Sequence, residues 1–212
     1  MIAAGGLSGG LSSTIAGGKF IDGFRQGVIT SGLNHVAHMI VNKIQENKTI
    51  RNLVENAGYN PDDGGYLGEN ELVEFVNKVF PELYAEANRP AFEIHDNLVD
   101  SKGNSVMGKA VSDSKKIGDK YIIKSGGVIK LAKMSFYTYG VLAGTIGHEL
   151  VHITDMVSGN YQVWANKYGM THARTLSEVN AYNFEQKYSA PLYNPSEHQF
   201  YLNNMKEFNL KH

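Results

Sequence analysis

Apolar side chains recur every three or four positions in five segments of the chain, a spacing that predicts amphipathic helices. The five segments are residues 33–45, 70–83, 141–158, 176–188 and 196–208. Pro81 falls inside the second segment and is expected to kink or split that helix. Gly159 follows the third segment, where a glycine can cap the C-terminal end of a helix. The chain is therefore expected to be rich in helix, above all in its second half.

The stretch between residues 91 and 139 has a different pattern, in which short apolar groups alternate with turn sequences. Glycine-containing turn sequences occupy residues 100–104, 117–119 and 125–127. This pattern predicts two hairpins or a small antiparallel sheet. Together with the helices on either side, it indicates an α+β fold with a small antiparallel sheet and C-terminal helices.

Glycine is concentrated at the start of the chain, with nine glycines between Met1 and Gly32. The backbone of such a stretch loses much entropy on folding and offers few side chains to pack. We therefore expect loop or weakly ordered structure there. The chain divides, on this prediction, into a glycine-rich leader region at residues 1–48 and a folded domain at residues 49–212.

Composition narrows the classes of function. Hydrophobic residues make up 42% of the 212 residues and charged residues 19%, a balance typical of globular proteins. The net charge of −1 gives no reason to expect a nucleic-acid partner. No apolar run approaches the ~18 residues of a membrane span, and the N-terminus lacks the features of a signal peptide. Because the chain has no cysteine, a zinc ion would have to be held by His, Asp or Glu.

The strongest chemical signal is an HExxH motif inside the third predicted helix, His148-Glu149-Leu150-Val151-His152. Side chains four positions apart lie on one face of a helix, so both imidazoles can reach one metal ion. At ~100° per residue, the two histidines point away from the apolar stripe of their helix. Glu149 lies beside them, where it can act on a metal-bound water. The motif therefore predicts a zinc site in a cleft; the alternative is a pair of exposed histidines with a solvated Glu149.

A catalytic zinc site needs three protein ligands and one open position, so a further ligand is required. Asp155 lies on the histidine face but ~10 Å along the axis from His148, so we expect it either to hydrogen-bond a ligand histidine or to be a surface aspartate without a role in the site. Glu178, on the next predicted helix, is the preferred third ligand, and Glu185, two turns later on the same face, is the reserve candidate. The competing structural explanation for Glu178 is a capping box with Thr175 as its N-cap.

An HExxH motif followed by a glutamate on a later helix resembles the gluzincin-type zinc metallopeptidases. The resemblance covers residues 141–188. It implies a zincin-like fold in which Zn²⁺ is bound by His148, His152 and Glu178. It also implies that Glu149 is the general base, which takes a proton from the attacking water and passes one to the leaving amine. The expected activity is hydrolysis of peptide bonds in a protein or peptide substrate.

The same resemblance implies a donor that stabilises the oxyanion of the tetrahedral intermediate, a role that Tyr or His fills in similar peptidases. His172 is our first candidate for this catalytic role and Tyr182 is the second. Such enzymes also bind the substrate backbone along an edge strand near the motif helix. Residues 128–139, just before that helix, are the candidate edge strand.

Residues 16–27, followed by Gly32-Leu33-Asn34-His35-Val36-Ala37-His38, resemble the region that follows the core of bacterial Rhs-repeat proteins. In those proteins a variable C-terminal toxin domain comes after such a region. The resemblance reaches to residue 45 and implies the toxin or effector domain of a larger exported protein. It also implies that this protein is secreted or delivered into a target cell, and that a cognate immunity protein is a further partner. The alternative is a glycine-rich leader with no such history.

Two other classes of function stay open on the sequence alone. One is a non-catalytic secreted binding domain with a degenerate zinc site, which a missing third ligand or a site closed to water would favour. The other is a membrane-acting toxin that uses the glycine-rich N-terminus, although that segment is short and only weakly hydrophobic.

Overall fold

The computed structural model describes residues 49–101 and 103–211, and every structural statement below concerns those residues. The chain divides by its contacts into two units, and the larger one comprises Lys48–Leu98 and Val106–His212. This larger unit carries the fold and the site described here. The glycine-rich leader region and the helix predicted at 33–45 lie outside the described residues.

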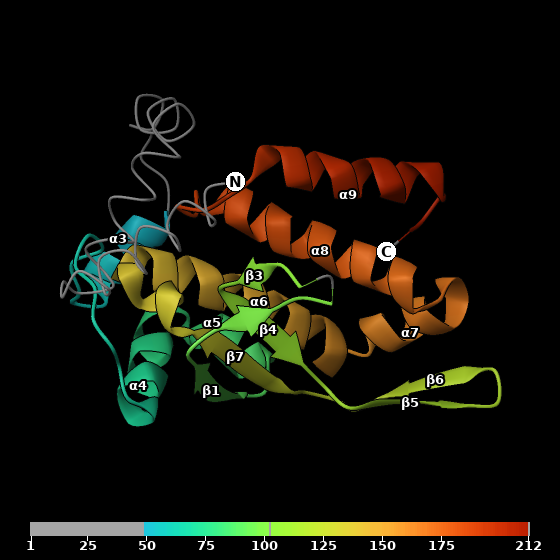
Figure 1. Cartoon of the computed structure of the whole chain (residues 1–212), viewed down its shortest axis with the longest axis horizontal. Coiled ribbons are helices and arrows are strands. Elements are labelled where there is room, and N and C mark those ends of the chain that lie inside the picture. Colours follow the sequence, from blue (N-terminus) through green and yellow to red (C-terminus); the bar gives the residue numbers. More distant parts are fainter. Residues whose placement is uncertain (1–48, 102, 212) are drawn as a thin grey trace. The chain divides into compact units, whose positions relative to one another are not determined.

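Helices flank a central group of strands, as the α+β prediction requires (Figure 1). Before the strands come α3 (Ile50–Asn56), α4 (Glu69–Val79) and α5 (Pro81–Glu86). After the strands come the 3₁₀ helix η1 (Lys133–Tyr137), then α6 (Tyr139–Val157), α7 (Asn160–Tyr168), α8 (Met170–Lys187) and α9 (Pro195–Glu207). Pro81 splits the helix predicted at 70–83 in two, because proline can begin a helix but cannot continue one.

The strands form one three-stranded sheet and two short two-stranded sheets. The three-stranded sheet contains, in spatial order, β1 (Ala91–His95), β7 (Val128–Ala132) and β4 (Gly108–Val111). The two-stranded sheets are β2 (Leu98–Val99) with β3 (Ser105–Val106), and β5 (Ser114–Ile117) with β6 (Lys120–Ile123).

The two predicted hairpins are confirmed, because residues 100–104 join β2 to β3 and residues 117–119 lie at the turn between β5 and β6. Two other predictions about the strands are wrong. The main sheet is mixed, because β1 pairs with β7 in parallel while β4 pairs with β7 antiparallel. The residues between β1 and β7 supply the long connection that a parallel pair needs. Residues 128–139 are not an edge strand: β7 is the central strand, and η1 follows it. The edge strand in contact with α6 is β4.

Helix α6 packs between the main sheet on one side and α8 on the other, and α9 covers α8 (Figure 1). Its apolar stripe is in the core as predicted, with Ile146, Leu150 and Ile153 fully buried. The opposite face of α6 therefore meets α8, and that is the face on which the sequence placed the two histidines. The fold thus brings the HExxH helix against the helix that carries Glu178.

Gly147 permits the close approach of α6 and α8. A Cβ atom at this position would collide with the ring of Phe184 on α8. That ring packs against Phe80 and Tyr188 and has little room to move. We expect Gly147→Ala to lower the free energy of unfolding by about 1–3 kcal/mol, as overpacking does, in urea denaturation of the purified protein.

Gly144 is the matched control, one turn earlier on α6. A Cβ there would lie 3.4 Å from Pro191 Cδ and 3.5 Å from Ala190 Cβ, which is ordinary packing distance. Gly144→Ala is expected to leave stability unchanged or raise it by up to ~1 kcal/mol through helix propensity. Equal destabilisation by both substitutions would contradict the specific packing argument at Gly147.

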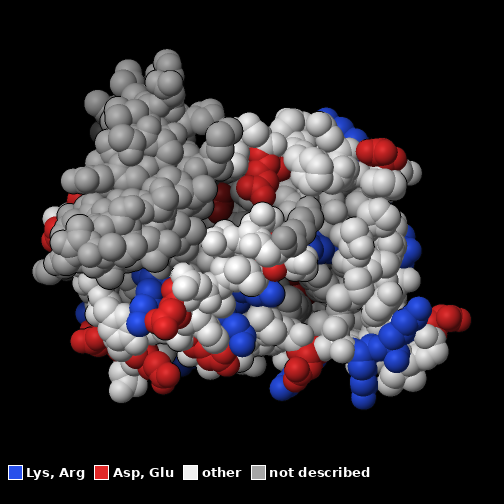
Figure 2. Space-filling view, viewed as in Figure 1, with Lys and Arg blue, Asp and Glu red and all other residues white. Residues whose placement is uncertain are grey.

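The β5–β6 hairpin forms one exposed, basic part of the molecule. Its strands and the residue after β6 carry four exposed lysines, namely Lys115, Lys116, Lys120 and Lys124. Figure 2 shows Lys and Arg side chains gathered where Figure 1 draws this hairpin. Within the described part of the chain, no helix has the length and apolarity to cross a membrane.

Candidate metal centre

Helix α8 begins earlier than the sequence indicated, and this changes the interpretation of Glu178. The helix starts at Met170, so Thr175 lies inside it, where its hydroxyl donates to the carbonyl of Thr171. The capping box that competed for Glu178 is therefore absent from this position. Glu178 is instead on the buried face of α8 that packs against α6.

His148, His152 and Glu178 lie together and can hold a metal ion. The two Nε2 atoms are 3.1 Å apart, and Glu178 Oε2 is 3.6 Å from His148 Nε2 and 3.8 Å from His152 Nε2. Ligand atoms at 2.0–2.2 Å from a tetrahedral ion are separated by roughly 3.3–3.6 Å. The three atoms thus have nearly the spacing that a shared zinc ion would give them, and the prediction of the trio agrees with this geometry.

Glu185 supports His148 and does not join the trio. Its Oε1 lies 2.8 Å from His148 Nδ1, on the far side of the imidazole from the other candidate ligands. A proton on Nδ1 donated to this carboxylate leaves the Nε2 lone pair free for a metal. The carboxylate also fixes the orientation of the ring, as carboxylate partners of metal-bound histidines do.

His152 is held by a second set of hydrogen bonds. Its Nδ1 lies 2.8 Å from Ser177 Oγ, and Ser177 donates its hydroxyl proton to Asp155 Oδ2 over 2.7 Å. Because Ser177 gives its only proton to Asp155, it must accept one from His152, which places the imidazole proton on Nδ1 and frees Nε2. Asn180 in turn donates its amide to both oxygens of Asp155. Asp155 therefore acts on His152 through the hydroxyl of Ser177, whereas the sequence predicted a direct hydrogen bond between Asp155 and a ligand histidine.

Glu149 is buried at the edge of β4. Its side chain is 7% exposed, and its Oε2 accepts a hydrogen bond of 2.6 Å from the Ala110 backbone N–H. Gly108 allows this approach, since a Cβ there would lie 2.8 Å from Glu149 Oε1. Burial raises the pKa of Glu149 to about 7, against a smaller opposing effect of His148. A carboxyl group with such a pKa can both accept and donate a proton near neutral pH.

The charges around the trio are strongly coupled. Burial acts to lower the pKa of His148, but hydrogen bonds to Glu178 and Glu185 outweigh it and raise this pKa well above its ordinary value. Burial lowers the pKa of His152 to about 4. For Glu178, burial acts to raise the pKa, but the two histidines and Arg174 outweigh it and lower this pKa to about 2. Without a metal, the trio therefore pairs an ionised Glu178 with a protonated His148, and a metal ion that binds there would displace the His148 proton and take over its positive charge.

The structure brings Tyr182 to the site but gives His172 other partners. The ring of Tyr182 stands edge-on to His148 at 5.4 Å between ring centroids, and its hydroxyl is hydrogen-bonded to Glu197 of α9. Burial, with a further contribution from Glu197, raises the pKa of Tyr182, so the phenol stays protonated. His172 instead contacts the Tyr168 carbonyl at 2.8 Å and packs against Phe208. These contacts place His172 on the side of α8 away from the trio.

Three contributors to the site were missed by sequence reasoning. Ser177 and Asn180 hold Asp155, and the Ala110 N–H holds Glu149. The first two lie inside the helix predicted at 176–188, but nothing in that segment indicated that it would pack against Asp155. The backbone N–H carries no sequence signal at all. Its role depends on the course of β4 beside α6.

The hydroxyl of Ser177 is expected to contribute to metal affinity. Ser177→Ala removes the acceptor for His152 Nδ1 and leaves Asp155 with one donor fewer. We expect a 10–100-fold weaker Zn²⁺ affinity, the usual effect of losing such a partner, measured by competition with a chromophoric chelator. The exposed Ser125→Ala is the control and should not change the affinity. An unchanged affinity in Ser177→Ala would show that the hydroxyl does not position His152.

Comparisons of this chain with protein-family models, curated proteins and solved structures find no match. The chemistry of the site therefore has to follow from its own geometry. That geometry comprises a trio of N, N and O ligand atoms, a partner for each histidine, and a buried carboxyl group beside them.

Proposed function

We propose that this protein is a zinc-dependent metallopeptidase with a gluzincin-like site and a zincin-like arrangement of its sheet and motif helix. The observation that carries the proposal is the spacing of His148, His152 and Glu178, which suits one tetrahedral ion. Zinc fits this donor set better than Mg²⁺ or Ca²⁺, which prefer oxygen ligands, because two of the three donors are imidazoles. Three protein ligands leave one position for water or substrate, as catalytic zinc sites do.

Glu149 is the general base of the proposed reaction. Bound zinc would supply a Lewis acid that activates water and polarises the scissile carbonyl. Glu149 accepts the proton of the attacking water and later passes it to the leaving amine. Burial raises the pKa of Glu149 above its ordinary value, which favours a carboxyl group that exchanges protons near neutral pH, and the Ala110 N–H keeps the group oriented. Glu185 and Ser177 keep each histidine in the tautomer that presents Nε2.

Substrate binding is proposed along the outer edge of β4. This strand is at the end of its sheet, with β7 on one side only. Ala110 donates to Glu149, so its N–H points outward, away from β7. A peptide that pairs with this edge would therefore run past the general base. Tyr182, beside His148, is the oxyanion donor proposed from the sequence candidates, and its hydroxyl would have to exchange its Glu197 partner for the oxyanion to fill this role.

The biological setting is the second part of the proposal. The resemblance of residues 1–45 to the region after the core of Rhs-repeat proteins supports a toxin or effector domain of a larger exported protein. The peptidase would then act on a protein in the target cell, and a cognate immunity protein would protect the producer. The non-catalytic alternative is less well supported, because Glu178 lies where a third ligand is needed and the side chains of the trio keep 11–15% of their surface exposed.

The proposal is tested with the zinc-loaded protein and a mixture of denatured proteins and peptides as substrate. New N-termini are expected to appear, to stop appearing when a chelator removes zinc, and to return when zinc is added back. Cleavage that continues in the metal-free protein, or zinc-loaded protein that cleaves nothing in such a mixture, would contradict the proposed activity.

A further inference from the structure

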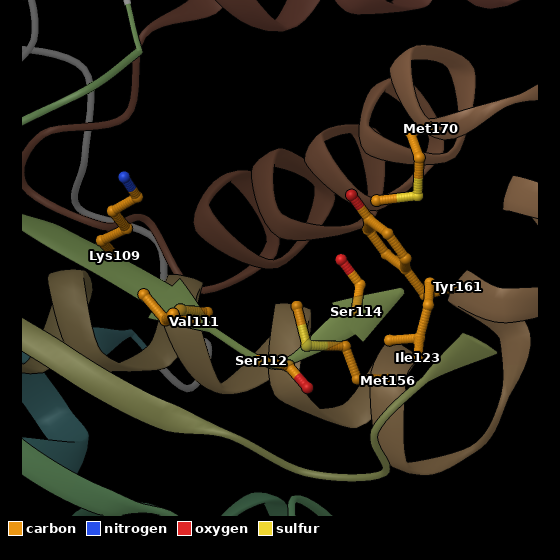
Figure 3. Close-up of a pocket in the computed structure, with 9 residues that line it drawn as sticks. Lys109, Val111, Ser112, Ser114, Ile123, Met156, Tyr161 and Met170 are labelled. Atoms are coloured by element: carbon orange, nitrogen blue, oxygen red, sulfur yellow. The ribbon is translucent and has the colours of Figure 1, made fainter. Parts of the chain in front are cut away.

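A pocket opens beside β4, between the sheet and the helices that follow the motif. It has a volume of about 190 Å³. Its apolar lining comes from Val111, Ile123, Met156, Tyr161 and Met170. Figure 3 shows Tyr161, Ile123 and Met170 on one side of it and Val111 on the other. With Ser114 of β5 and Met156 of α6, six separate elements contribute to its wall.

The pocket adjoins the proposed catalytic site at two points. Ala110 lines the pocket and also donates its N–H to Glu149. Tyr161 lines the pocket and is close enough to Arg174 and Glu178 for their charges to affect its pKa, which burial raises. A peptide lying along the outer edge of β4 would therefore carry a side chain past the mouth of the pocket within a few residues of the reacting bond.

The size and lining of the pocket fit a large apolar side chain. A protein cavity of ~150 Å³ lined by apolar side chains accommodates benzene, so this pocket has room for a phenylalanine, leucine or methionine side chain. Met156 and Met170 add flexible, polarizable surface that adapts to aromatic or aliphatic groups. The wall is also held firmly, because Asn166 and Gln162 of α7 accept hydrogen bonds from Tyr121 and Ile123 of β6.

Positive charge beside the pocket disfavours basic side chains. Lys109 is part of its lining. The β5–β6 hairpin, which contributes Ser114 and Ile123 to the wall, carries the basic surface seen in Figure 2. Lys124 of this surface is paired with Asp113, while Lys116 lies over the Tyr121 ring. An arginine or lysine entering the pocket would meet like charge and apolar walls, and both disfavour it.

We propose that this pocket binds an apolar side chain of the peptide substrate and directs cleavage to peptides with a large apolar residue at that position. This inference rests on the proposed peptidase function and names its substrate class. Ala110 links the two, because the strand that would hold the peptide backbone also forms one wall of the pocket.

Filling the pocket is the direct test. Ser114 is exposed and lines the pocket opposite Ile123 in the hairpin, so Ser114→Trp places an indole there without disturbing the core. Lys115→Trp is the matched control, since neighbouring residues of a strand point to opposite faces. Peptides that differ only in Phe, Leu, Gly or Lys at one position are compared by kcat/KM in the zinc-loaded protein.

The wild-type protein is expected to prefer Phe and Leu over Gly and Lys by at least about tenfold. Ser114→Trp should abolish this preference, Lys115→Trp should retain it, and Lys109→Glu should raise the relative rate of the Lys peptide. An equal rate for all four peptides in the wild type, or an unchanged preference in Ser114→Trp, would overturn the inference while leaving the peptidase activity standing.

A binding measurement separates failure of the pocket from failure of the proposed function. The same peptides, fluorescently labelled, are titrated into zinc-loaded Glu149→Gln protein with and without Ser114→Trp. If no peptide is cleaved by the wild type, a preference for Phe over Lys in binding that Ser114→Trp removes still supports the pocket. Equal binding of all four peptides refutes it, whatever the outcome of the cleavage assay.

Discussion

Glu149→Gln is expected to retain zinc and to lose peptidase activity by about 10²–10⁴-fold in kcat, the usual contribution of a general base. The glutamine amide oxygen can still accept the Ala110 N–H, so the side chain keeps its place. Glutamine cannot accept the proton of the attacking water. Because Glu149 is not one of the three candidate ligands, zinc content should stay at one ion per chain.

The measurement pairs steady-state cleavage of one peptide with metal analysis of the same protein sample. Glu86→Gln, an exposed change on α5, is the control and should leave both quantities unchanged. Loss of zinc in Glu149→Gln would mean that the residue supports the metal and does not only act on water. Full activity with full zinc would rule out Glu149 as the base.

The second large effect is expected at Glu178 and distinguishes it from Glu185. Glu178→Gln replaces a carboxylate ligand by a neutral amide and should weaken Zn²⁺ affinity by more than ~100-fold. Glu185→Gln keeps an acceptor for His148 Nδ1 and should weaken it by 10–100-fold at most, as for partners of ligand histidines. Both variants are isosteric with the wild type, and both residues are buried on α8.

Competition titrations with a chromophoric chelator give both affinities under identical conditions. Thermal unfolding of the metal-free proteins shows whether either variant has lost its fold. If Glu185→Gln lost more Zn²⁺ affinity than Glu178→Gln, the third ligand would be Glu185. Equal affinities for wild type and Glu178→Gln would remove Glu178 from the site.

The sequence predicted the long helices and the motif better than it predicted the sheet, although it missed the short helices α3 and α7. The phase of the apolar stripe on α6 placed both histidines opposite Ile146 and Leu150, because helical periodicity depends only on residues close in the chain. The pairing of β1 with β7 joins residues more than thirty positions apart, such as Phe92 and Ile129. Local patterns carry no information about such partners, so the antiparallel prediction failed at that pair.

In the candidate site, too, the sequence predicted the residues that follow from local spacing and missed the contacts that depend on packing. His148, Glu149 and His152 follow from one helical turn, and Glu178 follows from the need for a third ligand. The start of α8 was set too late because Thr175 and Glu178 matched a capping pattern, while the structure begins that helix at the Gly169 cap. The contacts of Ser177 and of the Ala110 N–H depend on how separate elements pack, and only the three-dimensional structure reveals them.

The central claim is that one zinc ion is shared by residues of α6 and α8, and diffraction from zinc-loaded crystals at the zinc absorption edge tests it most directly. The account predicts a single strong anomalous peak within ~2.0–2.2 Å of His148 Nε2, His152 Nε2 and a Glu178 carboxylate oxygen. Glu185 should remain on His148 Nδ1. An anomalous peak at any other place, or none between the two histidines at full zinc loading, would contradict the account.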